Sequence, residues 1–553
     1  MSLEKKNWWK ESIMYQIYPR SFKDNNGDGI GDLKGIIEKL DHIASLGIDV
    51  IWLGPVFKTP NDDNGYDISD YYSIDPEFGT MEDFDDLLQG LHQRGIKLIM
   101  DLVVNHTSDE HDWFIQSKSS TDSPYRDFYY WIPGERNNPP TRWEAFFGGS
   151  AWEFDEHTSS YYLHLFTKKQ PDLNWENPRV RQEVYRMMKF WLDKGIDGFR
   201  MDVISLISKR LPFRDYNYEH FMEMVYNVHA NGPRIHEFLQ EMHREVLQHY
   251  DIMTVGEGPG ISKEIAKDYI GHDRNELNMI FQLDLMFMDH GPGGKFDIQP
   301  VSFKDFKNLF REWDKSVSET GWNNIFLDNH DFPRMVSRFG NDHTYREKST
   351  MLLLTFLMTM RGTPCIYMGS EIGMTNVAFK DLKDYRDIET LNYLQKIKKE
   401  GGNLKIAIKN VHVQGRDNAR VPMQWNENEH AGFTTGTPWI SVNPEYKNIN
   451  VEKAESDSDS ILHFFRRLIK LRKSGKFPVL GDFRELFPEH LNLFLFTRTD
   501  GLKRVFICLN FSDHIIDMPS IPFRYEYWLG NYGNMTETKM RPWEALICKI
   551  TSG

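Results

Sequence analysis

The sequence is poor in cysteine and has no long apolar run. Its 553 residues include only Cys365, Cys508 and Cys548. Three distant cysteines without a CxxC pair exclude a disulfide framework and a cysteine zinc site, and they predict a cytoplasmic protein. The longest apolar stretch, around Met351–Met360, is shorter than the ~20 residues of a membrane span. The N-terminus has no apolar core, so we expect no secretory signal.

The sequence also lacks an excess of positive charge. Lysine and arginine number 66 against 81 aspartates and glutamates, which leaves a net charge of −15. This balance argues against a nucleic-acid backbone or an anionic membrane as the main partner. We expect a small, neutral substrate instead, and a monomer or weak homodimer.

What the chain does contain is an alternation of short apolar runs with amphipathic segments. The runs do not alternate in polarity, as is typical of parallel strands that are buried on both faces. The segment Leu33–Leu46 has helical spacing and stops at Gly47, and Pro178–Lys194 follows the cap residue Asn177. Together these patterns predict an α/β fold, a (β/α)8 TIM barrel. The expected strands are Ile13–Tyr18, Val50–Leu53, Lys97–Val103, Gly198–Asp202, Ile252–Gly256, Met279–Leu283, Asn324–Leu327 and Cys365–Tyr367.

Three regions depart from this alternation. Residues 104–174 are rich in Trp, Tyr, Pro and Asn, and they are too long for a βα loop, so we expect an inserted lid domain after the third strand. The barrel then comprises residues 1–103 and 175–479, with an irregular subdomain at about 374–459. Residues 480–553 contain four strand-like runs and predict a C-terminal antiparallel β-sandwich domain.

Charged residues gather where several of the predicted strands end, which is where barrel enzymes carry their catalytic groups. Asp101 and His106 follow the third strand, Arg200 and Asp202 end the fourth, Glu257 ends the fifth, and His330 and Asp331 follow the seventh. Each acid alone could be a helix cap or a surface ion pair. Carboxylates from several separate strands together indicate a catalytic site.

The types and spacing of these residues suggest a division of roles. Arg200 and Asp202 are two apart and point to the same side of a strand, so the arginine is expected to lower the pKa of the carboxyl and keep it ionised. Glu257 follows an apolar run, and a drier setting would keep it protonated as a general acid. A nucleophilic carboxylate and an acid ~5–5.5 Å apart are what a retaining glycosidase uses.

Nine short segments of the chain resemble motifs of the α-amylase superfamily and its oligo-1,6-glucosidase subgroup. The resemblance covers nearly the whole chain and is weakest after about residue 480. The segments are Asp101-Leu-Val-Val-Asn-His106, Gly198-Phe-Arg-Met-Asp-Val203, Val255-Gly-Glu257, Asn329-His-Asp331, Gln170-Pro-Asp-Leu-Asn174, Asn64-Gly-Tyr-Asp67, Gly415-Arg-Asp-Asn-Ala-Arg420, Pro422-Met-Gln-Trp425 and His430-Ala-Gly-Phe-Thr-Thr-Gly436.

The resemblance implies a role for each matching position. Asp202 would be the nucleophile, Glu257 the acid/base, and Asp331 the third carboxylate, which grips sugar hydroxyls. An Asp67–Arg416 pair would block the far end of the pocket and impose exo action, with Arg420 as the alternative arginine. The remaining positions implied to line the glucose pocket are Tyr66, His106, Phe166, Gln170, Arg200 and His330.

Val203 is the residue from which we predict the linkage. It follows the nucleophile, and in the resembling subgroup valine there accompanies α-1,6 bonds, whereas threonine accompanies α-1,4 bonds. We therefore expect hydrolysis of isomalto-oligosaccharides at the non-reducing end. The subgroup commonly has other residues at Gly258, Asp328 and Phe332, which flank the catalytic groups.

Several alternatives share the same three carboxylates: an α-1,4-glucosidase, a trehalose-6-phosphate hydrolase and a sucrose isomerase. The chain has no Arg-Leu-Asp-Arg-Asp stretch of the kind that sucrose isomerases carry. A different class is the non-catalytic heavy chain of certain amino-acid transporters, but those chains carry a membrane helix.

A loop near the N-terminus has the spacing of a calcium site. Its expected ligands are the side chains of Asp24, Asn26, Asp28 and Asp32 and the carbonyl of Ile30, with Gly29 at the turn. Position 12 of the pattern is Gly35, so the usual glutamate is missing. We expect a structural Ca²⁺, or Mg²⁺, remote from the chemistry, with an Asx-rich turn as the alternative.

Overall fold

The eight expected parallel strands form one closed sheet. The structure is a computed structural model that describes residues 7–379, 381–536 and 538–552. The strand order is β11-β10-β9-β5-β2-β1-β15-β14, and β14 contacts β11 to close the barrel. The (β/α)8 prediction is therefore confirmed. The strands are β1 (Met14–Ile17), β2 (Val50–Leu53), β5 (Lys97–Leu102), β9 (Gly198–Met201), β10 (Met253–Glu257), β11 (Met279–Phe281), β14 (Asn324–Ile325) and β15 (Thr363–Tyr367).

The register of the strands brings the catalytic candidates to one level. Asp101 in β5 lies opposite Arg200 in β9, and Arg200 lies opposite Val255 in β10. Glu257, two residues beyond Val255, is therefore level with Asp202, two residues beyond Arg200. All of these strands are parallel, so these side chains meet at the carboxyl end of the barrel.

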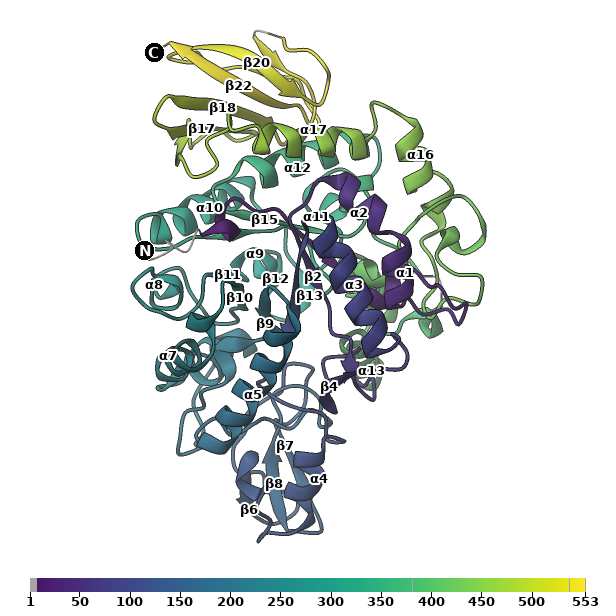
Figure 1. Ribbon diagram of the computed structural model, residues 1–553, viewed down its shortest axis with the longest axis vertical. Helices are drawn as coiled ribbons and strands as arrows, with labels where there is room; N and C mark the ends of the chain where they lie inside the picture. Colours follow the sequence, from purple (N-terminus) through teal and green to yellow (C-terminus); the bar gives the residue numbers. More distant parts are fainter. Residues whose placement is uncertain (1–6, 380, 537, 553) are drawn as a thin grey trace.

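Helices surround the barrel (Figure 1). The segment expected as one helix from Leu33 to Leu46 is two, because Lys39 leaves helical geometry (φ −102°, ψ 10°). The principal helices are α1 (Leu33–Glu38), α2 (Leu40–Leu46), α3 (Met81–Gln93), α5 (Pro178–Lys194), α7 (Ile235–Glu245), α8 (Ala266–Ile270), α10 (Phe303–Val317), α11 (Met335–Phe339), α12 (Arg346–Thr359) and α17 (Ile461–Lys473); α6 (Phe221–Met224) and α9 (Asp284–Phe287) are single turns.

The insertion after β5 projects from one end of the molecule (lower part of Figure 1). It holds α4 (Asp112–Ser119) and an antiparallel sheet ordered β6-β8-β7, formed by Trp131–Pro133, Ser160–Leu163 and Trp152–Asp155. A bridge between His106 and Asp172 joins the end of the insertion to the mouth of the barrel. A hairpin of β3 (Phe57–Lys58) and β4 (Asp70–Ile74) lies between β2 and α3 in the sequence.

The region after β15, expected to be irregular, is largely helical. Its helices begin at side-chain caps such as Asp387 and Asn403, which accept hydrogen bonds from the first-turn amides. They are α13 (Ile388–Lys399), α14 (Leu404–Gln414), α15 (Asp417–Arg420) and α16 (Val451–Ser456). A hairpin of β12 (His290–Gly291) and β13 (Gly294–Ile298) contacts α14.

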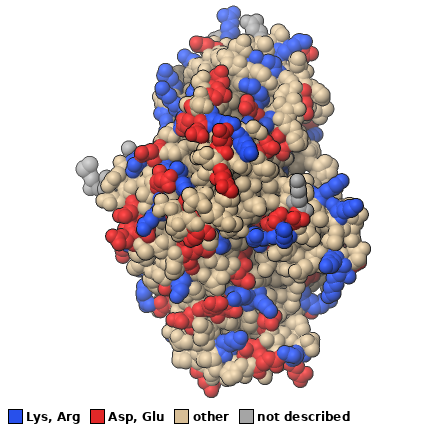
Figure 2. Space-filling model, turned by 90° about the vertical axis from the view of Figure 1, so that its right-hand side faces the viewer, with Lys and Arg blue, Asp and Glu red and all other residues tan. Residues whose placement is uncertain are grey.

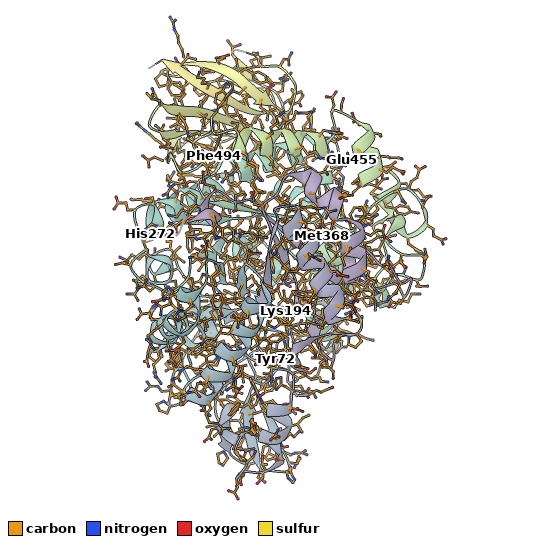
Figure 3. The ribbon with its side chains drawn as sticks, in the orientation of Figure 1. Tyr72, Lys194, His272, Met368, Glu455 and Phe494 are labelled. Atoms are coloured by element: carbon orange, nitrogen blue, oxygen red, sulfur yellow. The ribbon has the colours of Figure 1, made fainter. Side chains whose placement is uncertain are left out.

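The C-terminal strands form a five-stranded antiparallel sheet and a two-stranded one. The large sheet has the order β16-β17-β18-β22-β20, and β19 pairs with β21. One face packs on the barrel helices, where Phe494 meets Phe356 of α12 (Figure 3). The strands are β16 (Asp482–Leu486), β17 (Leu493–Asp500), β18 (Lys503–Asn510), β19 (Ile516–Asp517), β20 (Arg524–Gly530), β21 (Lys539–Met540) and β22 (Ala545–Ser552).

The visible surface carries charges of both signs. Figure 2 shows acidic and basic side chains interspersed from one end of the molecule to the other. Within the described residues, no helix combines the length and apolar character that crossing a membrane requires. The three cysteines are buried and unbonded.

Candidate active site

The centre of the site is a buried arginine bound by three carboxylates. Arg200 Nη1 lies 2.6 Å from Asp101 Oδ1 and 2.6 Å from Asp202 Oδ1, and Nη2 lies 2.9 Å from Glu257 Oε2. The guanidinium also lies over the ring of Trp52. We call Arg200, Asp101, Asp202 and Glu257 the catalytic cluster. It combines one positive charge with three acids.

This imbalance determines where a proton resides. Burial raises the pKa of Asp202 well above its usual value, and Glu257 and Asp101 raise it further against the opposing effect of Arg200. The pKa of Glu257 is also raised by burial. Arg200 lowers the pKa of Asp202 as expected, but burial outweighs the arginine, so the net shift is upward. Because the two acids bind the same guanidinium, their protonation equilibria depend on each other.

Asp331 has the opposite electrostatic environment. Its Oδ1 lies 2.7 Å from Arg420 Nη2 and 3.3 Å from Arg416 Nη1. Burial would raise the pKa of Asp331, but His330, Arg420 and Arg416 hold it well below the usual range. Asp331 is therefore ionised throughout the working pH range.

Two neutral histidines flank the carboxylates. Gln16 Nε2 donates to His330 Nδ1 at 2.8 Å, so the ring proton is on Nε2, which lies 3.1 Å from Asp331 Oδ2. Burial lowers the pKa of His330 to about 3, and that of His106 to about 4. Tyr66 stacks on His330 with ring centroids 5.2 Å apart. Both imidazoles can act as hydrogen-bonding groups without adding charge.

A cavity of about 150 Å³ opens above these groups. This is smaller than the ~300–1,000 Å³ of sites that enclose drug-sized ligands, so it admits a small group. Eight of the predicted site residues line it: Tyr66, His106, Phe166, Asp202, Val203, Glu257, Asp331 and Arg416. The other lining residues are Asp63, Phe146, Phe147, Pro259, Leu283, Phe287, Lys295, Phe332 and Glu389.

Four predicted pocket residues lie behind its wall. Arg200 and His330 support the carboxylates, as described above. Gln170 is fully buried and donates to Asp63 Oδ2 at 3.2 Å. Asp67 is fully buried as well, and its carboxylate accepts from the backbone amides of Asp62 (2.8 Å) and Asp63 (3.0 Å).

The predicted Asp67–Arg416 pair was wrong, and Asp63 takes the place of Asp67. Arg416 Nη2 lies 3.6 Å from Asp63 Oδ1 and 2.6 Å from Asp387 Oδ1. Asn64 (φ 50°) and Gly65 (φ 100°) turn the chain between Asp63 and Asp67. The turn leaves Asp63 on the cavity and directs Asp67 to the backbone. The Asn-Gly dipeptide was a signal that the two acids face different ways.

We call Arg416 and its acids Asp63, Asp331 and Asp387 the end-wall cluster. Sequence reasoning missed Asp63 and Asp387, and it also missed Glu389, which lies 3.8 Å from Arg416 and pairs with Lys295 at 2.7 Å. Burial raises the pKa of Asp63 to about 7, whereas Arg416, followed by Arg420 and Lys295, outweighs burial and lowers that of Asp387. Asp63, Asp331 and Arg416 of this cluster line the cavity.

The backbone after the nucleophile candidate is strained. Val203 has φ 36° and ψ 38°, an unfavourable region for a β-branched residue. In this conformation Val203 N–H donates to Glu257 Oε2 at 3.1 Å. The strained residue therefore links the two catalytic carboxyls through its backbone and presents its side chain to the cavity.

The predicted metal loop is closed by Asx-type hydrogen bonds. Asp24 accepts from the amides of Gly27 and Gly29, Asp28 accepts from Ile30, and Asp32 accepts from Asn25. Across the described residues, no three His, Cys, Asp or Glu side chains are grouped to hold a metal ion. The loop does bring the buried acids Asp24 and Asp32 close enough that Asp24 raises the pKa of Asp32, although burial is the larger cause. Its chemistry is all oxygen, as Ca²⁺ prefers.

A parallel barrel with carboxylates at its strand ends is the architecture of a glycosidase of the barrel type. A family profile described as the α-amylase catalytic domain matches residues 16–480. The chain belongs to the α-amylase family.

Individual relatives are similar over almost the full length. An oligo-1,6-glucosidase of Parageobacillus thermoglucosidasius is 54% identical, with 98% of this chain and 99% of the relative covered. A Bacillus licheniformis trehalose-6-phosphate hydrolase superposes with a TM-score of 0.93 at 44% identity, covering 99% and 100%. An isomaltulose synthase of Erwinia rhapontici, solved with sucrose, gives 0.95 at 42% identity, covering 98% and 99%.

Proposed function

We propose that this protein is a retaining, exo-acting α-glucosidase that hydrolyses α-1,6 bonds at the non-reducing end of isomalto-oligosaccharides. The observation that carries the proposal is the catalytic cluster, in which Asp202 and Glu257 bind one guanidinium and both line the cavity. The 54% identity to an oligo-1,6-glucosidase supports the linkage. The proposal rests on the geometry of the site together with this similarity.

Glu257 is suited to donate the proton. Its Oε2 accepts from Arg200 Nη2 (2.9 Å) and Val203 N–H (3.1 Å), so the proton of the protonated form belongs on Oε1. Glu257 lines the cavity and its pKa is raised by burial. It would protonate the leaving oxygen and, once ionised, accept a proton from the incoming water.

Asp202 is suited to attack the sugar. Its Oδ1 is fixed by Arg200, which leaves Oδ2 to form the bond to the anomeric carbon. Both carboxyls bind adjacent nitrogens of one planar guanidinium, which favours the ~5–5.5 Å separation of a retaining pair over the wider inverting one. The ionised Asp331 would accept hydrogen bonds from sugar hydroxyls and stabilise positive charge in the transition state.

The end-wall cluster supports exo action. Arg416 and its carboxylates close the cavity beyond the position of the terminal sugar, so a chain can enter only by its end. The side chain of Val203 borders the cavity, where a methyl in place of a hydroxyl shifts preference by ~1–3 kcal/mol.

Product analysis tests the whole proposal. Isomaltose, panose, maltose, sucrose, trehalose and trehalose 6-phosphate should be compared by kcat/KM, with NMR detection of the first anomer released. We expect isomaltose to exceed maltose and α-glucose to appear first. A higher kcat/KM on maltose or trehalose 6-phosphate contradicts the linkage, release of isomaltulose from sucrose indicates an isomerase, and β-glucose contradicts retention.

We also propose that the Asp24–Asp32 loop binds one Ca²⁺ with a structural role. Asp24, Asn26, Asp28 and Asp32 and the Ile30 carbonyl would hold it, and two adjacent buried carboxylates without an ion-paired lysine or arginine among the described residues support a cation there. EDTA should lower the Tm by a few degrees and Ca²⁺ should restore it. The Asp28→Asn variant should weaken the response, and an unchanged Tm in EDTA contradicts the site.

The remaining proposals concern location and assembly. The buried, unbonded cysteines fit a cytoplasmic protein, which cell fractionation would test. We expect a monomer or a weak homodimer, which light scattering over a range of concentrations would distinguish.

A further inference from the structure

A second, larger hollow adjoins the catalytic cavity. It has a volume of about 550 Å³ and lies between residues 146–149 of the insertion, the β12–β13 hairpin and α13. Four residues line both hollows: Phe146, Phe147, Lys295 and Glu389. We call this second hollow the outer groove. The shared residues make it continuous with the mouth of the catalytic cavity.

The walls of the outer groove combine aromatic faces and side-chain amides. Phe296 and Tyr393 are stacked with ring centroids 4.3 Å apart, and Asn392 and Gln395 stand beside them on α13. Asn392 Nδ2 also donates to the Phe147 carbonyl at 3.3 Å and so ties α13 to the insertion. Apolar ring faces with amides that both donate and accept match the two faces and the hydroxyls of a pyranose.

The charge of the groove favours a neutral occupant. Lys295 Nζ lies 2.7 Å from Glu389 Oε2, so the lysine nearest the catalytic cavity is neutralised. Lys396 and Lys399 also line the groove, where their side chains are exposed and solvated by water. The lysine beside the catalytic cavity is therefore paired, and the two other lysines of the lining are hydrated.

We infer that the outer groove binds the leaving-group glucose units of an isomalto-oligosaccharide beyond the first. This inference rests on the proposed function. In the proposed function the Asp63–Arg416 pair lies behind the terminal glucose, so the rest of the chain must leave through the mouth, where Lys295 and Glu389 line both the cavity and the outer groove. The enzyme would then prefer isomaltotriose and longer chains to isomaltose.

A chain-length series tests the inference. We expect KM to fall about fivefold from isomaltose to isomaltotriose with kcat unchanged, because contacts remote from the reacting bond bind substrate and transition state equally. Tyr393→Ala and Gln395→Ala should remove this gain and leave isomaltose kinetics unchanged. Lys398→Ala is the matched control, because Lys398 is on α13 but outside the groove lining.

The outcomes separate the inference from the function on which it rests. No hydrolysis of any α-1,6 substrate overturns the proposed function. Two results would contradict the role of the groove while leaving the proposed function intact. One is hydrolysis of isomaltose and isomaltotriose with equal KM. The other is a lower KM for isomaltotriose that persists in both Tyr393→Ala and Gln395→Ala. A lower KM for trehalose 6-phosphate than for isomaltose, lost in Lys396→Ala, would instead indicate a phosphate-binding groove and overturn the neutral occupant.

Discussion

Two arginine-centred clusters lie on the same cavity, and they hold charge in opposite ways. In the catalytic cluster one arginine serves Asp101, Asp202 and Glu257, so burial prevails and the pKa values of all three acids are raised. In the end-wall cluster Arg416 is supported by Arg420 and Lys295, so Asp331 and Asp387 stay ionised. The number of cations per carboxylate differs between the two clusters. The pKa values of the acids are therefore raised in the first cluster, whereas those of Asp331 and Asp387 are lowered in the second.

The difference matches what each region has to do. In the proposed retaining mechanism a proton has to move, and the raised pKa of the buried Glu257 suits it to carry that proton. Recognition of a sugar end, as proposed for exo action, needs acceptors that do not change, and the three cations Arg416, Arg420 and Lys295 keep Asp331 and Asp387 ionised. The same residue types thus serve catalysis or binding according to local balance.

The largest effect is expected from neutralising the nucleophile. Asp202→Asn should lower kcat on isomaltose by about 10⁴-fold or more, because no other group can form the glycosyl bond. It also removes one acid from an overcrowded cluster, so the Tm should be unchanged or higher. Glucose release and thermal unfolding measure the two effects. Wild-type turnover in this variant would overturn the mechanism.

Removing Arg416 from the end-wall cluster should lower both stability and activity, unlike the loss of the Asp202 carboxylate. Arg416→Met leaves Asp63, Asp331 and Asp387 against Arg420 and Lys295, so breaking these buried pairs should cost about 3–5 kcal/mol of stability. We expect kcat/KM to fall about 10²-fold because the sugar end is misplaced. Arg416→Lys keeps the positive charge but loses the planar guanidinium that binds two carboxylates. Its stability and kcat/KM should lie between those of the wild type and Arg416→Met. A large loss of activity with an unchanged Tm would show that Arg416 does not hold the wall together.

The two clusters also differed in how well they could be predicted from sequence. The catalytic cluster lies at the ends of buried parallel strands, which appear in the sequence as unbroken apolar runs, so all eight strands and the residues at their ends could be located. The register of the strands then brings Asp101, Arg200, Asp202 and Glu257 together without reference to any loop.

The end-wall cluster joins loops that are remote in sequence, and no local periodicity relates them. Asp63 and Arg416 are brought together only by the fold, and Asp387 was overlooked because it is also a helix cap, the ordinary use of an aspartate before a helix. The net pKa shift of Asp202 could not be predicted for a related reason. Arg200 does lower this pKa, as the spacing predicted, but burial outweighs it, and the spacing of Arg200 and Asp202 carries no information on burial.

A smaller effect is expected at Val203, which lines the cavity and bonds to Glu257 of the catalytic cluster. Val203→Thr should raise kcat/KM on maltose relative to isomaltose by about tenfold, since a hydroxyl replaces a methyl at the cavity wall. Both residues are β-branched, so the strained backbone and the Val203 N–H bond to Glu257 should be kept. Val203→Ala is the control for lost volume. An unchanged ratio in Val203→Thr would place the linkage determinant elsewhere.

The smallest effect is expected at Asp63. Its pKa is raised, whereas the pKa values of Asp331 and Asp387 in the same end-wall cluster are lowered. Its Oδ1 has no hydrogen-bond partner among the described residues and lines the cavity, and burial raises its pKa to about 7. Below that pH Asp63 is protonated and accepts sugar hydroxyls poorly, so KM for isomaltose should fall a few-fold as pH rises through 7. Asp63→Asn should have a higher KM that no longer changes near pH 7. If KM still falls near pH 7 in Asp63→Asn, the titrating group belongs to the pair Asp202 and Glu257. The end-wall cluster would then contain no group that titrates near pH 7.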